Sequence, residues 1–346
     1  MTYILCIIVV SVSSIIAGKY NNKKALFFTA FILSVFCGLR GIGVGVDTIH
    51  YYNFLSYIRG SGIGFGSDIG FSVISYILMG IFKNPHTPLL IYSFITNYLI
   101  VYRLWDFKEK ASFPVMILIY VIIHYPYTFN IVRQFLAISI VFWATRYIER
   151  DKYIKYIILN VIATTFHTSS LLCFGYLFVK VGFETKKKKY RYLGIGLAII
   201  FILVGLVLFT NNVQKYEQYF IQTSTGFHAM TILKIFCTIL IIFFNKIYKN
   251  TKFSISEYRE YVSMNKEIVI IYQLGLLLAG LGMFFTFMNR IGFYFLIYEM
   301  PFWGQVVRAV RNKDMYRILI GTILIYIIIA MLLFDTSGLI AYSTYF

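Results

Sequence analysis

The stretch ILCIIVVSVSSIIA, residues 4–17, contains no charged side chain. No basic segment precedes it, as one would precede the apolar core of a signal peptide, and further apolar runs follow it instead of a soluble chain. Such runs, near the roughly 18 residues that cross a hydrocarbon core about 30 Å thick, recur to the end of the sequence without a polar block of domain size. The sequence therefore predicts one integral membrane domain over residues 1–346.

The composition supports this class of protein. Hydrophobic residues make up 59% of the chain and charged residues 13%, and the mean hydropathy is +0.75, which is too apolar for a soluble domain of this length. Only helices and closed barrels satisfy their backbone hydrogen bonds within lipid, and the runs are longer than the roughly 10-residue alternating strands of a barrel. We expect an all-α polytopic membrane protein.

The net charge of +18 is concentrated in a few segments. Most of the 32 basic residues lie in residues 18–24, 103–110, 146–155, 180–191, 246–266 and 308–317. The positive-inside rule makes these segments cytoplasmic turns and places both chain ends outside. The basic segments are not interleaved with aromatic residues on an exposed face, so no nucleic-acid partner is indicated, and membrane lipids are the expected partners.

Threading the chain through these turns predicts about 12 transmembrane helices. They cover residues 2–17, 25–39, 89–103, 112–124, 130–147, 153–166, 168–180, 192–210, 229–246, 268–288, 291–308 and 317–334. One more apolar run, GFSVISYILMGIF at residues 70–82, would put the basic turn 103–110 outside if it crossed. We therefore predict a short re-entrant or surface-lying helix there.

Polar side chains gather near the predicted external ends of the spans. In FNIVRQFLAISI (129–140), Asn130, Arg133 and Gln134 are three and four residues apart, so one helix would present them on one face. In GLRGIGVGVDTIHYYNFL (38–55), Asp47 can cap a short surface helix. His167, in FHTSS (166–170), marks an external turn between two short spans.

A second helical face is predicted in FMNRIGFYFLIYEM (287–300). Arg290, Tyr294 and Tyr298 follow the i, i+4, i+8 spacing, and Glu299 would lie about 13 Å further along the axis than Arg290. A carboxylate at such depth is either a functional residue or half of an ion pair, for which Lys234 is a candidate partner.

The sequence contains no recognisable metal or nucleotide site. The histidines are scattered, the glycines of residues 41–45 follow no strand and precede no G-K-S/T, and no G-x-S-x-G occurs. We therefore expect no metal and no cofactor. Arginine and tyrosine recur instead. The N–H groups of an arginine form paired hydrogen bonds with pyrophosphate oxygens. Tyrosine offers sugars a ring face and a hydroxyl. These residues suit a glycan carried on a lipid pyrophosphate.

Four motifs occur in a familiar order: R-x(4)-G-V-D-T-x-x-Y-Y from Arg40, N-I-V-R-Q-F-L-A-I-S-I from Asn130, A-T-T-F-H-T-S-S-L from Ala163, and N-R-x-x-x-Y from Asn289, before a helix with Pro301. The chain thereby resembles the EpsG family of polysaccharide polymerases, which is akin to the Wzy O-antigen polymerases. Such proteins commonly have an acid before the G-F of the third apolar run. The nearest counterpart here, Asp68, departs from that position, and we leave it out of the predicted site.

The resemblance implies a GT-C-like bundle in the cytoplasmic (inner) membrane with an active site facing the exterior. It implies a glycosyltransferase that moves a growing glycan from undecaprenyl pyrophosphate onto the terminal sugar of another lipid-linked repeat, as in lipopolysaccharide synthesis, with a chain-length regulator as a further partner. Asp47 or His167 would accept the proton of the acceptor hydroxyl. The expected substrate-binding residues are Arg40, Tyr51, Arg133, Gln134, Asn289, Arg290 and Tyr294, of which Arg133 and Arg290, assisted by Arg40, would hold the pyrophosphate.

Three other functions stay open. An O-antigen ligase uses the same donor but typically has a large late external loop, whereas the longest late external stretch here is residues 211–228. A flippase or other transporter would show internal repeats or paired broken helices, which we do not find. A membrane acyltransferase with His167 as its base is the third alternative.

Overall fold

The computed structural model describes residues 2–61, 68–184, 192–194, 196, 229, 231–239, 266–283, 286–309, 313–333 and 342–345. The α-helices are α1 (Thr2–Tyr20), α2 (Lys23–Gly38), α3 (Thr48–Ser61), α4 (Ile69–Phe82), α5 (His86–Asp106), α6 (Phe113–Ile119), α7 (Tyr127–Asn130), α8 (Val132–Ile148), α9 (Tyr153–Phe166), α10 (Gly175–Glu184), α14 (Lys266–Leu281), α15 (Thr286–Leu296), α16 (Glu299–Ala309) and α17 (Lys313–Leu333). A π-helical turn, η1 (Tyr120–His124), extends α6, and a 3-10 turn, η2 (Thr168–Phe174), precedes α10. The predicted span 192–210 and the basic turn 246–266 lie almost wholly outside the described residues.

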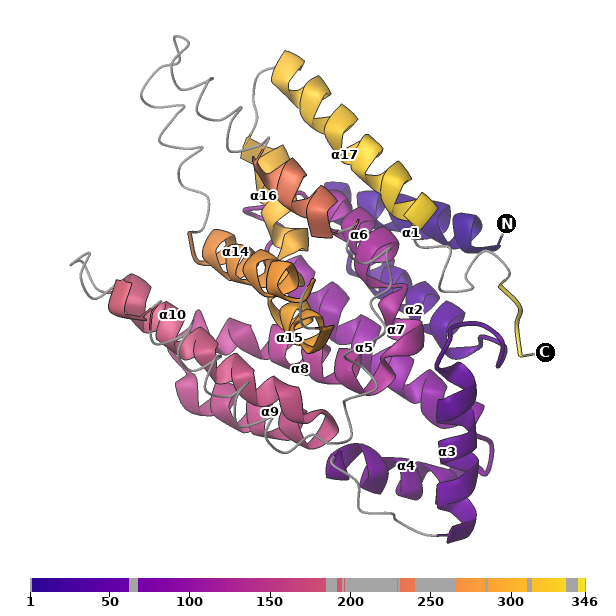
Figure 1. Ribbon diagram of the computed structural model, residues 1–346. Coiled ribbons are helices and arrows are strands. Elements are labelled where there is room, and N and C mark those ends of the chain that lie inside the picture. Colours follow the sequence, from indigo (N-terminus) through magenta and orange to yellow (C-terminus); the bar gives the residue numbers. More distant parts are fainter. Residues whose placement is uncertain are drawn as a thin grey trace.

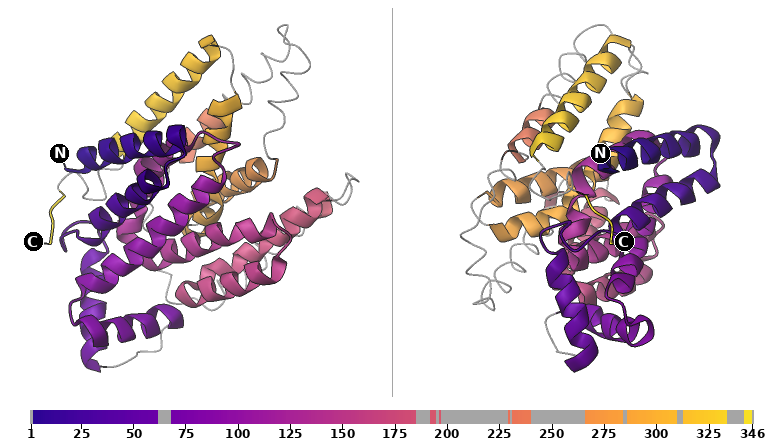
Figure 2. Two further views of the ribbon diagram at one scale, coloured as in Figure 1. Left: turned by 180° about the vertical axis from the view of Figure 1, so that it is seen from behind. Right: turned by 90° about the vertical axis from the view of Figure 1, so that its right-hand side faces the viewer.

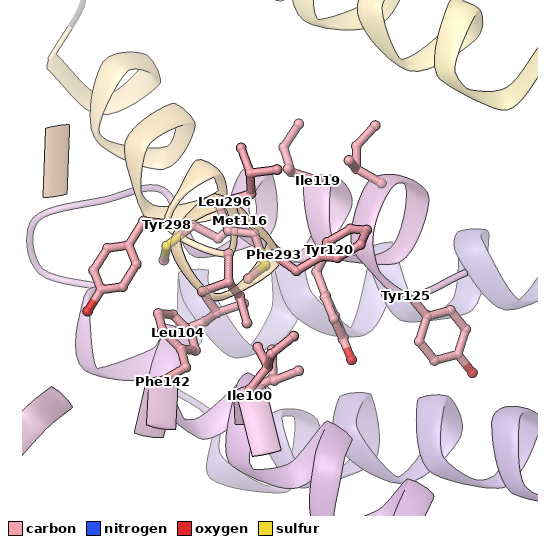
Figure 3. Close-up of a cluster of buried hydrophobic side chains, with 14 of the residues drawn as sticks. Ile100, Leu104, Met116, Ile119, Tyr120, Tyr125, Phe142, Phe293, Leu296 and Tyr298 are labelled. Carbon is pink, nitrogen blue, oxygen red and sulfur yellow. The ribbon is translucent and has the colours of Figure 1, made fainter. Parts of the chain in front are cut away.

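The described chain is helical apart from one isolated bridge between Arg40 and Thr344. Helices α2, α5, α8 and α9 pack in succession, while α3 and α4 form a corner of the molecule away from α17 (Figures 1 and 2). Buried side chains of α5, α6, η1, α8 and the 293–298 segment fill the centre (Figure 3). They include Ile100, Leu104, Met116, Tyr120, Phe142, Phe293, Leu296 and Tyr298.

Four of the six basic segments meet at one end of the bundle, which we name the basic end. Lys108 donates a hydrogen bond to the side chain of Asn21, and Arg308 donates one to the carbonyl of Lys108. Arg103 forms an ion pair with Glu149. The ends of α1, α5, α8 and α16 are thereby joined, which is the arrangement that the predicted threading requires.

The opposite end of the bundle holds the turn between α2 and α3 together with residues 342–345. The backbone N–H of Tyr345 donates to the carbonyl of Leu39 over 3.0 Å, and the N–H of Val46 donates to Asn130 Oδ1 over 2.7 Å. Both termini lie on this side in Figure 1.

Within the described residues, Thr2–Tyr20 is the one helix that is long and apolar enough to cross a membrane, judged by length and composition alone. Six shorter apolar helical segments, among them α4, accompany it. The α-helical class is supported, whereas the number of about 12 spans, and whether residues 70–82 cross, stay predictions.

The structure corrects the predicted helical face of Asn130, Arg133 and Gln134. The chain leaves the helical conformation at Ile131, with φ −96° and ψ 56°, so α7 ends at Asn130 and a new helix begins at Val132. The Asn130 side chain instead accepts the hydrogen bond of the Val46 N–H. A side chain that bonds to a neighbouring loop competes with the continuous helix that the spacing predicted.

The predicted boundaries of the spans 268–288 and 291–308 are also wrong, because this region contains three helices, α14, α15 and α16. The chain turns at Ile297 and Tyr298, so Glu299 begins α16 and does not continue the face of Arg290. Pro301 explains the break. It has no N–H for the carbonyl of Ile297, and its ring would collide with that carbonyl in a continuous helix, whereas proline is tolerated in a first turn.

Gly38, at the end of α2, allows α2 and α5 to approach closely, since a Cβ there would lie 2.7 Å from the Cα of Leu90. We expect Gly38→Ala to lower the free energy of unfolding by about 1–3 kcal/mol, because the two backbones must move apart. Thermal unfolding in detergent micelles measures this. Gly80→Ala, in α4, is the control, because nothing lies within 4 Å of its Cβ position. Equal unfolding temperatures for the two variants would contradict this packing.

Candidate functional site

A cavity of about 350 Å³ lies between the corner formed by α3 and α4 and the rest of the bundle. Its lining comes from segments that are far apart in the sequence: the start of α3, α4, the start of α8, the turn after α9, and α15. The lining residues are Asp47, His50, Tyr51, Phe54, Phe71, Ile131, Arg133, Gln134, His167 and Arg290. The short helix predicted after Asp47 is confirmed as α3, and its residues His50, Tyr51 and Phe54 line the cavity.

Arg133 is the second residue of α8 and stands on the cavity wall. Its Nη1 lies 2.7 Å from Oδ2 of Asp68, and its guanidinium carbon lies 6.0 Å from the ring centre of Tyr51 and 5.8 Å from that of Phe71. The Arg133 side chain is 44% exposed, whereas that of Asp68 is only 5% exposed. The buried carboxylate thus holds one edge of the guanidinium while a large part of it faces the cavity.

Tyr51 is the aromatic neighbour of that guanidinium. Burial, opposed by the charge of Arg133, raises the pKa of the Tyr51 hydroxyl above its ordinary value of 10.0. At neutral pH this hydroxyl is therefore protonated and can both donate and accept hydrogen bonds, as sugar recognition requires.

His167 follows the last residue of α9 in an extended conformation, with φ −158° and ψ 117°. The backbone N–H of His167 donates to the carbonyl of Ala163, and its carbonyl accepts from the N–H of Ser170 over 3.1 Å. The predicted turn after α9 is therefore confirmed. Nδ1 of His167 lies 3.5 Å from Oδ2 of Asp68, the oxygen that also contacts Arg133.

Arg290 reaches the same cavity from α15. Gln134, one residue beyond Arg133, donates a hydrogen bond from Nε2 to the backbone carbonyl of Arg290. This bond fastens α15 to α8, so that two arginines separated by more than a hundred residues line one cavity.

Three predicted substrate-binding residues do not line the cavity. Arg40 is 1% exposed, and it donates to Thr48 Oγ1 over 2.9 Å and to the carbonyls of Cys37 and Phe129 over 2.6 and 3.1 Å. Asn289 is buried and donates to the carbonyl of Gly282, and Tyr294 is buried and accepts from Ser169. The side chains of Arg40, Asn289 and Tyr294 thus form hydrogen bonds within the fold.

Asp68, which is absent from the predicted site, contacts two of the residues that belong to it. It immediately precedes α4 and is 4% exposed. The family pattern of an acid before G-F was the signal that could have found it, since Asp68 lies two residues before Gly70 and Phe71.

Glu299 belongs to a second polar cluster, away from the lining of the cavity. Its Oε2 lies 2.6 Å from Nζ of Lys234 and 3.1 Å from Nε2 of His124, and its Oε1 accepts from the hydroxyl of Tyr326. Glu299 itself is fully buried. The predicted ion pair between Glu299 and Lys234 is confirmed.

Among the described residues, no group of three or more His, Cys, Asp and Glu side chains is arranged to hold a metal ion. What the cavity presents is two guanidinium groups, an imidazole beside a buried carboxylate, and rings. This arrangement can bind an anion and accept a proton next to it.

Comparison with known proteins agrees with the resemblance seen in the sequence motifs. The model of the EpsG family matches residues 23–345. No curated protein and no solved structure matches the chain. Because the family model covers nearly the whole sequence, the chain belongs to the EpsG family, which is associated with polysaccharide polymerase-like membrane proteins.

Proposed function

We propose that this protein is a polysaccharide polymerase of the cytoplasmic membrane. It moves a growing glycan from undecaprenyl pyrophosphate onto the terminal sugar of another lipid-linked repeat unit. Membership of the EpsG family supports polysaccharide synthesis at a membrane. The choice of a polymerase rests on the contents of the cavity.

The observation that carries the proposal is the meeting of Arg133, Arg290 and His167 in one cavity with an aromatic wall. Pyrophosphate is a dianion or trianion whose oxygens match the N–H groups of guanidinium in pairs. Aromatic faces and the Tyr51 hydroxyl suit sugar rings. A donor glycan and its pyrophosphate thus find suitable partners side by side.

The proposed reaction is one displacement at the anomeric carbon. A hydroxyl of the acceptor sugar gives its proton to a base as its oxygen bonds to that carbon, and the bond from the carbon to the pyrophosphate oxygen breaks. Arg133 and Arg290 stabilise the charge that the departing pyrophosphate gains. His167 accepts the proton, and Asp47, which lines the same cavity, is the second candidate for this role.

The position of the cavity supports an external reaction. It lies near Asn130 and the turn before α3, whereas the basic segments gather at the basic end. Under the positive-inside rule the basic end is cytoplasmic, and the cavity then opens toward the exterior, where the lipid-linked repeats are polymerised.

Arg133→Ala is expected to abolish polymer while the protein stays in the membrane, because the pyrophosphate loses a charge-assisted pair of hydrogen bonds. The measurement is a gel of lipid-linked or lipopolysaccharide glycans from a deletion strain that carries each variant. Arg59→Ala is the matched control, because Arg59 donates to the carbonyl of Lys83 and does not line the cavity.

The proposal requires that the deletion strain shows a single repeat and that wild type and Arg59→Ala restore the ladder. Loss of even the single repeat on deletion would indicate ligation or export. An unchanged ladder on deletion would indicate an acyltransferase or another activity, and wild-type chain lengths with Arg133→Ala would remove this arginine from the site.

A further inference from the structure

The side chain of Asp68 does not cap the helix that it precedes. An aspartate before the first residue of a helix ordinarily accepts hydrogen bonds from the free N–H groups of the first turn. At the start of α4 no such side-chain bond forms, although the backbone carbonyl of Asp68 accepts from the N–H of Ser72. The carboxylate points instead to Arg133 of α8 and His167 after α9.

This direction depends on a close approach between α4 and α9. A Cβ at Gly70 would lie 2.7 Å from Cβ of Thr165 and 3.0 Å from its carbonyl carbon. Only glycine at this place lets the start of α4 lie against the end of α9. The sequence Asp68-x-Gly70 thus brings a buried carboxylate beside the imidazole two residues beyond Thr165.

Burying the Asp68 carboxylate costs free energy of folding. The Asp68 side chain is 5% exposed, and its Oδ1 has no hydrogen-bond partner among the described residues, while its Oδ2 contacts both Arg133 and His167. A buried carboxylate destabilises a fold unless its partners compensate for the loss of water. Helix capping does not account for Asp68, and both of its partners line the cavity.

We propose that Asp68 is a positioning residue that serves both halves of the polymerase reaction, an inference that rests on the proposed function. No hydrogen bond joins the two side chains, but a carboxylate 3.5 Å from Nδ1 of His167 electrostatically favours the tautomer with hydrogen on Nδ1, so that Nε2 is the atom that accepts the proton of the acceptor hydroxyl. The same oxygen holds one edge of the Arg133 guanidinium and so fixes the orientation in which this cation faces the pyrophosphate.

Other ionisable side chains lie around His167. The ionisable side chains that line the cavity with His167 are Asp47, His50 and Tyr51 of the α3 segment, Arg133 of α8 and Arg290 of α15, while Asp68 contacts His167 itself and Tyr294 of α15 accepts from Ser169. Asp68 is the carboxylate within 3.5 Å of the imidazole. Its removal therefore withdraws the nearest negative charge from the group that we assign as the base.

The test uses purified full-length protein and the single-repeat lipid extracted from the deletion strain. Initial rates of chain extension are measured against lipid concentration. For Asp68→Asn we expect the rate at saturating lipid to fall about 10²- to 10⁴-fold. Asp68→Glu should recover part of the rate.

Two further variants separate positioning from folding. Gly70→Ala should reproduce part of the loss, since the added Cβ forces α4 away from Thr165. Asp106→Asn is the matched control, because Asp106 pairs with Arg103 and Arg146 at the basic end, and its rate should equal that of wild type.

The outcomes are distinguishable. If wild type extends no lipid, the proposed function fails. If wild type extends it and Asp68→Asn keeps the wild-type rate per folded molecule, Asp68 only supports the fold and this inference fails. A loss confined to the amount of folded protein would likewise exclude a positioning role.

Discussion

Glu299→Ala is expected to destabilise the protein by about 3–5 kcal/mol, which is the usual cost of leaving a buried charge without its partner. Lys234 is 7% exposed and lies 2.6 Å from the fully buried carboxylate, so its ammonium would remain in the interior uncompensated. The donors from His124 and Tyr326 would also lose their acceptor. We expect most of the variant to be missing from the membrane fraction.

The measurement is the amount of protein in membranes together with the thermal unfolding of what can be purified. Glu109→Ala is the control, because Glu109 pairs only loosely with Lys108, at 3.8 Å, and is largely exposed. Such surface pairs contribute about 0–1 kcal/mol. Lys234→Met combined with Glu299→Gln should recover part of the stability, since neither charge then remains buried.

A stable but inactive Glu299→Ala variant would give the polar cluster around Glu299 a different role. If Glu299→Ala unfolds at the wild-type temperature but loses polymer, the carboxylate takes part in the activity and does not merely join α16, α17 and η1 to residues 231–239.

His167→Ala is expected to lower the rate of chain extension by about 10²- to 10⁴-fold with little change in protein amount, as for the removal of a general base. The side chain is 16% exposed, and the backbone bonds of His167 to Ala163 and Ser170 do not depend on it. Rates measured with the single-repeat lipid, per molecule of folded protein, check this expectation. The neighbouring variant Leu171→Ala tests local disruption, since Leu171 is half exposed on the same turn.

Asp47→Ala decides between the two candidate bases. Asp47 lines the cavity from the start of α3, and His167 lines it from the turn after α9. Retention of activity in His167→Ala together with its loss in Asp47→Ala would assign the proton transfer to Asp47 and remove His167 from the mechanism.

Much of the helical framework follows from the pattern of apolar runs. The predicted spans 25–39, 89–103 and 153–166 agree closely with α2, α5 and α9, because uninterrupted apolar segments bounded by polar turns favour helices whatever surrounds them. The breaks at Ile131 and before Glu299 were not predicted. The first accompanies a hydrogen bond to Asn130 from Val46, which is distant in the sequence, and the second depends on the ring of Pro301, and hydropathy registers neither.

For the site, the kinds of residue could be predicted from the sequence, as could six members of the cavity lining: Asp47, Tyr51, Arg133, Gln134, His167 and Arg290. Short motifs and the separation of basic from other polar segments were sufficient for this, because both are local properties of the chain.

The tertiary structure alone decided that Asp68 lies beside Arg133 and His167 and that Arg40 does not reach the cavity. Periodicity relates residues on one helix, whereas these two results depend on where separate elements meet. The start of α4 approaches α9 through Gly70, and carbonyls from Cys37 and Phe129 satisfy Arg40. A buried cation whose three guanidinium nitrogens all donate within the fold does not also bind a substrate, and only the packing of distant backbone around it reveals that state.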